Sequence, residues 1–79
     1  MRLRNLSVLC YANGFTLWAY KDSSDLLATV TSPHFLGDAA DMLSVGDMVL
    51  LAAADGGTVR MVAHIQHGTQ PHVLTVPLS

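Results

Sequence analysis

Three aspartates stand close together in the segment GDAADMLSVGD, residues 37–47, of a chain that is otherwise poor in charge. Carboxylates at this density suggest a metal site or an acid/base pair. A hard cation, however, needs several oxygens that converge on one point, as in a D-x-D-x-D-G loop with a distal glutamate. Asp38, Asp41 and Asp47 are spaced by three and then six residues, and the chain has no glutamate. We expect Asp38 at the N-cap or first turn of a helix and Asp47 in a turn.

The four histidines are the remaining candidate metal ligands. His64 and His67 are three residues apart, and on a strand this spacing turns the two side chains to opposite faces. His34 and His72 lie far from them in the sequence, so a zinc site would need long-range convergence. We therefore predict no metal and no cofactor.

No side chain has the setting of a catalytic nucleophile. The serines lack a G-x-S-x-G elbow, and the glycines form no phosphate-cradling loop. Cys10 is the only cysteine, which excludes a disulfide within one chain and a thiolate-rich metal site. We expect Cys10 to be a small buried hydrophobe. These residues predict a protein that is not an enzyme.

The composition favours contact with another protein. The chain has 79 residues, which predicts one domain spanning residues 1–79. Hydrophobic residues make up 51% and charged residues 13%, about half the usual charged share, so polar side chains cannot cover a lone small globule.

The charge and hydropathy patterns also exclude two classes of partner. Four basic residues in a chain of net charge −2 form no basic patch, which argues against nucleic acid. No segment has the ~18 unbroken apolar residues of a membrane helix, and the basic, apolar start lacks a signal-peptide cleavage site, so we expect mature sequence and no membrane partner.

The first half of the chain predicts a hairpin, then a segment with two alternatives, and then a short helix. Asn13-Gly14 lies between two β-prone runs, which predicts a hairpin with a type I′ turn. In residues 22–35, Asp22 and Ser23 could cap a short helix through Leu27, or a loop could lead to a strand over 27–31. Residues 36–43 predict one or two helical turns in which Leu43 packs inward.

The second half predicts a three-strand meander. The continuous apolar run 48–54 is typical of a strand covered on both faces, and residues 55–57 form a turn. Over 58–67 the alternation places Val59, Met61, Ala63 and Ile65 in the core. It places Thr58, Arg60, His64 and Gln66 outside. Two prolines confine the last strand, 72–78, to an edge. The sum predicts a mainly β fold, a small barrel or sandwich of about five strands.

Large apolar side chains are the candidates for contact with a partner. In residues 15–21, Phe15, Leu17 and Ala19 face one way and Thr16, Trp18 and Tyr20 the other. Trp and Tyr are enriched both in cores and at interfaces, so the face of Trp18 and Tyr20 is either core or a subunit contact. The residues predicted at an interface with another copy or another protein are Phe15, Trp18, Tyr20, Phe35, Met42 and Leu43.

The strings YANGFTLWAY, ATV, DAADML and VGDMVLL, together with Phe35, resemble a family of very short proteins that bacteriophages and prophages encode near the major capsid gene. The resemblance covers residues 5–53, and GFTLW followed by AADML-VGD is its most distinctive part. The chain departs from it at Ala19, where the family often has a polar residue, and at His34, where a tyrosine-type residue is common.

The resemblance implies a virion component, and in particular a decoration (cement) protein on the outer surface of the phage head. The family offers no catalytic residues. We therefore expect a structural protein that associates with itself as a homotrimer and binds the major capsid protein at local threefold positions. The alternatives are a tail or fibre-attachment component of the virion and a small metal- or ligand-binding domain with converging histidines.

Overall fold

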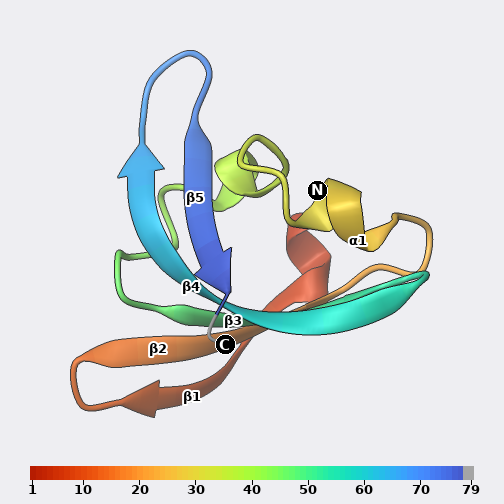
Figure 1. Cartoon of the computed structure of the whole chain (residues 1–79). Coiled ribbons are helices and arrows are strands. Elements are labelled where there is room, and N and C mark those ends of the chain that lie inside the picture. Colours follow the sequence, from red (N-terminus) through yellow and green to blue (C-terminus); the bar gives the residue numbers. More distant parts are fainter. Residues whose placement is uncertain (78–79) are drawn as a thin grey trace.

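The computed structural model describes residues 1–77, which fold into a β-sheet with short helical segments (Figure 1). The strands are β1 (Leu6–Ala12), β2 (Phe15–Lys21), β3 (Met48–Ala53), β4 (Gly56–Gln66) and β5 (His72–Pro77). The helical segments are the α-helix α1 (Leu27–Val30) and the 3-10 helices η1 (Leu3–Asn5) and η2 (Phe35–Ala39). The mainly β prediction is confirmed. Leu78, predicted in the last strand, lies outside the described residues.

The strands form one mixed sheet in the order β1-β2-β3-β4-β5. β1 and β2 form the predicted hairpin, and β3, β4 and β5 form the predicted antiparallel meander. β2 and β3 are parallel, and the crossover between them, residues 22–47, carries α1 and η2. The sheet is not closed into a barrel, and β5 is an edge strand, as its prolines predicted.

The hairpin turn differs in type from the prediction. Gly14 has φ +98°, whereas no residue other than glycine has a positive φ in the described part of the chain. A type I′ turn needs positive φ at both central residues, so Asn13 excludes it. The sequence therefore located the turn correctly, and its backbone conformation was predicted wrongly.

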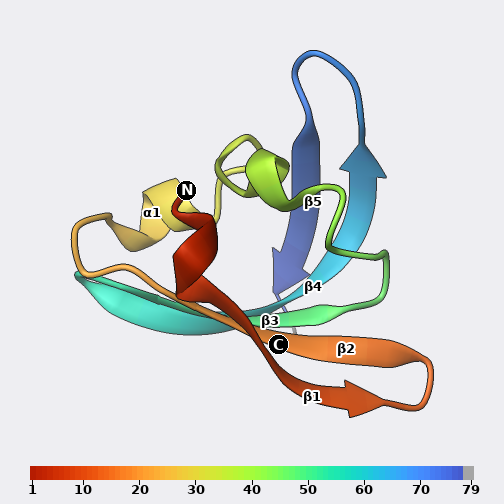
Figure 2. The same ribbon diagram turned by 180° about the vertical axis from the view of Figure 1, so that it is seen from behind.

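The helical segments lie on one side of the sheet only, and the two opposite views agree on this (Figures 1 and 2). The core fills the space between them and the inner face of the sheet. It contains Leu6, Trp18, Tyr20, Val30, Leu36, Ala39, Ala40, Leu43, Val49, Leu51, Val62 and Val73. Leu43 packs inward, as expected. Within residues 1–77, no helix combines the length and the hydropathy needed to cross a membrane.

A β-bulge in β4 overturns half of the predicted alternation. The register with β5 shifts between Val62 and His64, so one extra residue lies between them. Such a residue exchanges the inward and outward positions of the strand. Before the bulge Val62 is fully buried, and Val59 and Met61 turn away from the core; after it, Ile65 packs on the core as predicted.

The crossover helices also differ from their predictions. The structure matches neither alternative for residues 22–35. A helix was predicted to end at Leu27, or a strand to span 27–31, whereas α1 begins at Leu27. Its Leu27 N–H donates to Asp55 Oδ1 at 2.7 Å, so the cap comes from the β3–β4 turn rather than from Asp22 or Ser23. The second helix is a 3-10 helix, η2, followed by turns that reach Met42. Tertiary contacts therefore decide where these short helices form.

Candidate functional site

The sheet face turned away from the helices, here called the outer face, carries apolar residues in rows that cross the strands. The register aligns one row across the whole sheet, made of Cys10, Leu17, Met48, Met61 and Val76. The next row contains Ser7, Ala19, Leu50 and Val59. The third contains Lys21, Ala52 and Gly57. Lys21 is the only charged residue of these rows, and it lies at the end of β2.

No segment among the described residues covers the outer face. None of its residues is buried, and Leu50, on the middle strand of the sheet, is 36% exposed. The apolar run of β3 predicted a strand covered on both faces. In a single chain this prediction is wrong, because only Val49 and Leu51, on the inner face, are buried. The apolar residues on the other face of β3 therefore stay half-buried or exposed.

Cys10 lies on this outer face and is an exposed free thiol, so the prediction that it is buried is wrong. Its neighbour across the hairpin is Leu17. β1 is an edge strand with nothing over its outer side, and the side chain therefore stays accessible.

The predicted interface residues are divided by the fold. Trp18, Tyr20 and Leu43 are buried in the core of one chain, which is the first of the two alternatives for the face of Trp18 and Tyr20. Phe35 packs on Tyr20 with ring centroids 5.6 Å apart in an edge-on arrangement. Met42 is exposed beyond η2.

Phe15 is the one predicted interface residue that continues the outer face, next to Leu17 on β2. Sequence reasoning missed Leu50, Met48 and Met61 as contact candidates. The signal for the first two was the uninterrupted apolar run of β3, which a strand with one solvated face does not need.

The three clustered aspartates make different contacts, and only Asp47 is buried. Asp47 is 4% exposed, and its carboxylate accepts three hydrogen bonds. Oδ1 receives the N–H of Thr16 at 3.0 Å, while Oδ2 receives the indole N–H of Trp18 at 2.9 Å and the N–H of Ser44 at 3.0 Å. The predicted turn is present, since Asp47 N–H donates to Ser44 O at 3.0 Å. Asp47 therefore joins this turn to β2 as well.

The other two aspartates form separate surface pairs. Asp38 lies in the first turn of η2 without capping it, and its Oδ2 is 3.2 Å from the Met1 amino group. Asp41 pairs with His67, with 3.2 Å between Oδ1 and Nδ1. Each of the three carboxylates therefore has its own partner, and only Asp47 has the turn position expected of it together with hydrogen bonds to the backbone.

Three of the four histidines come together at one end of the sheet. The ring centroid of His72 lies 5.7 Å from that of His34 and 6.2 Å from that of His64. The long-range convergence that the sequence could not reveal is therefore partly present. Nevertheless, within the described ranges no three His, Cys, Asp or Glu side chains are placed to hold a metal ion.

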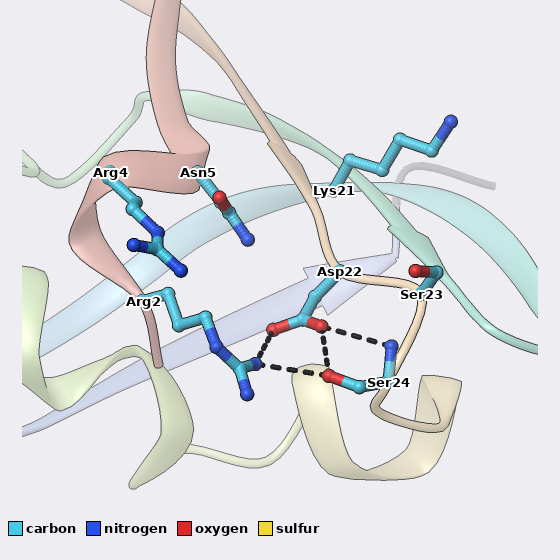
Figure 3. A pocket seen from close by; sticks show the side chains of 7 residues that line it. All are labelled: Arg2, Arg4, Asn5, Lys21, Asp22, Ser23 and Ser24. Atoms are coloured by element: carbon cyan, nitrogen blue, oxygen red, sulfur yellow. Dashed lines mark hydrogen bonds and ion pairs between the residues drawn. The ribbon is translucent and has the colours of Figure 1, made fainter.

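A cavity of about 460 Å³ opens beside the start of the chain (Figure 3). Its lining residues are Arg2, Arg4, Asn5, Lys21, Asp22, Ser23 and Ser24. Arg2 Nη1 donates to Asp22 Oδ2 at 2.6 Å and to Ser24 Oγ at 3.0 Å, while Lys21 extends away from this pair (Figure 3). Tyr20 also donates to Asp22, at 2.9 Å. The pocket is organised around one internal ion pair that fastens the N-terminal segment to the core.

Hydrogen bonds from the Ser24 side chain and backbone, followed by those from Tyr20 and Arg2, hold the pKa of Asp22 below its usual range. A carboxyl whose pKa is lowered by folding stabilises the folded state above its unfolded pKa, about 3.9, and loses that contribution as the pH falls further. We therefore expect Asp22→Asn to lower the urea midpoint at neutral pH, with the difference from wild type shrinking below about pH 4. Asp41→Asn, at a 96% exposed side chain, is the control that leaves the profile unchanged.

Comparison with known protein families, curated proteins and solved structures finds no match to this chain.

Proposed function

We propose that this protein is a non-enzymatic structural component of a bacteriophage virion, a decoration protein that binds the outer surface of the head as a small oligomer. The uncovered apolar outer face carries the proposal. Contiguous exposed apolar surface of several hundred Å² is rare on a protein that acts alone, and it marks a surface that another protein covers. The virion is proposed as the place of action because the strings in residues 5–53 resemble those of small phage proteins, a resemblance that rests on the sequence alone.

The distribution of polar groups supports a structural rather than a catalytic role. The buried carboxylates of Asp22 and Asp47 are each satisfied by hydrogen bonds within the chain. Carboxylates that are bound in this way hold neighbouring segments of the fold together, which is a structural use of a charged group. Arg60 is likewise bound to the hydroxyl and carbonyl of Thr75, at 2.6 and 2.8 Å.

The mechanism of a decoration protein follows from mass action. A protein that binds only the assembled, expanded shell stabilises that state by RT ln(1 + [L]/Kd). The major capsid protein is the proposed partner, and an oligomer that contacts several capsid subunits gains from avidity even when each contact is weak. Many copies acting together would offset the outward pressure of packaged DNA.

Location in the particle tests this function directly. We expect phage particles induced from the bacterium that carries the gene to contain this chain in a fixed ratio to the major capsid protein. Quantitative mass spectrometry of gradient-purified particles measures the ratio, and antibody labelling in the electron microscope locates the chain on the head. Absence from the particles would contradict the proposal. Labelling confined to the tail would favour the tail or fibre-attachment alternative.

A further inference from the structure

We infer that the outer face is the surface through which two copies of this chain associate, sheet against sheet, with Leu50 near the centre of the contact. The inference rests on the proposed function and names the partner of that same surface. This contact surface differs from the six interface residues predicted from the sequence. It consists mainly of the rows that contain Leu17, Leu50 and Met61.

The charge pattern fits association of like with like. In a symmetric interface, a residue near the axis meets its own copy, so a charge there would face the same charge. The outer face carries no charge except Lys21, which is at the end of β2 and can extend into water. A different partner chosen by electrostatic complementarity would instead favour charges inside the surface.

The available area suits a weak, reversible pair. The three rows hold twelve residues, and with ~4.8 Å between strands and ~6.8 Å between alternate residues of a strand they cover roughly 400 Å² per copy. A pair therefore buries about 800 Å², the size of a weak or transient contact. The chain exposes 4615 Å², close to the ~4,600 Å² of a compact monomer of this mass. The exposed apolar face is consequently a property of where the apolar residues lie, not of an extended shape.

Light scattering and thiol reactivity test the inference without any variant. Cys10 lies on the outer face and is the only cysteine, so its reaction with a thiol reagent such as Ellman's reagent reports whether the face is covered. We expect a mass of two chains at about 100 μM, and a thiol rate at least about tenfold slower than at about 1 μM. A monomer whose thiol reacts at one rate at all concentrations would overturn the inference. A mass of three chains would overturn the pair in favour of the trimer expected from the sequence.

Substitution of Leu50 tests the centre of the contact. Leu50→Asp places two like charges against each other in an apolar contact, and we expect the dissociation constant to rise by at least about 100-fold. Leu50→Thr keeps a residue suited to strands, and we expect a smaller rise with the fold retained. Val45→Asp is the matched control, because Val45 is 62% exposed and precedes β3, outside the outer face. Association that survives both Leu50 substitutions would overturn the inference.

The outcomes separate this inference from the proposed function. If the chain stays monomeric in solution but is found on phage heads, the face-to-face pair is contradicted and the decoration role is supported. If the chain pairs through the outer face but is absent from particles, the pair is supported and the decoration role is contradicted.

Discussion

Asp47→Ala is expected to lower the free energy of unfolding by about 4 kcal/mol, because three donors lose their common acceptor. Hydrogen bonds to a carboxylate contribute about 1.5–3 kcal/mol each, and their sum is reduced because they share one group. A domain of this size has a total stability of roughly 4–12 kcal/mol. Urea denaturation followed by Trp18 fluorescence measures the loss, and it also reports on the indole that Asp47 binds.

Two companion variants separate the hydrogen bonds from other effects. Asp47→Asn keeps the shape but turns an amide N–H toward one of the donors, so we expect about half of the loss. Asp41→Ala removes a 96% exposed carboxylate of the same cluster, and a change within about 0.5 kcal/mol is expected. A wild-type urea midpoint for Asp47→Ala would contradict the role assigned to the buried carboxylate.

Gly37→Ala is expected to cost about 3 kcal/mol for a purely steric reason. A Cβ at Gly37 would lie 2.1 Å from Pro71 O and 2.9 Å from Pro71 C. Both atoms belong to the backbone that leads into β5, which cannot yield as a flexible side chain would. Overpacking of a close contact costs ~1–3 kcal/mol, and a backbone neighbour places this case at the upper end. Thermal unfolding of the variant measures the effect.

Gly46 provides the contrasting control. It has φ +96°, and a Cβ at this position would meet no atom within 4 Å, so Gly46→Ala is limited by backbone conformation and should cost about 1 kcal/mol. Asparagine tolerates this conformation better than alanine, so Gly46→Asn should recover part of the loss. At Gly37, whose φ is not positive, asparagine should be worse than alanine because it is larger. Equal behaviour of the two sites would refute the steric explanation.

Local patterns predicted most of the β structure. Asn13-Gly14 located the first hairpin, and the turn residues around Gly56 and Gly68 separated the strands of the meander. These features depend on a few neighbouring residues, so they can be recognised without knowledge of the rest of the fold. The prolines that flank and end β5 identified an edge strand for the same reason.

The candidate site was only partly predictable. The alternation in residues 15–21 separated Leu17 and Ala19 from Trp18 and Tyr20, but it did not reveal which set faces the core. The sequence is compatible with either core or subunit contact for the face of Trp18 and Tyr20, and both side chains are buried in the core. Which face a strand buries depends on where the crossover helices lie, and these helices are too short to be specified by their own sequences.

The sequence by itself determined a small, mainly β chain rich in apolar residues and poor in charge, because composition and alternation are properties of the residues alone. Only the tertiary structure decided which of the apolar residues are buried and which lie on the outer face. The bulge after Val62 reverses the faces of β4, and the crossover places α1 and η2 on the same side of the sheet. The same crossover brings Asp47 to Trp18, a contact across 29 positions of sequence. Such pairings arise from packing between distant segments, and no local pattern encodes them.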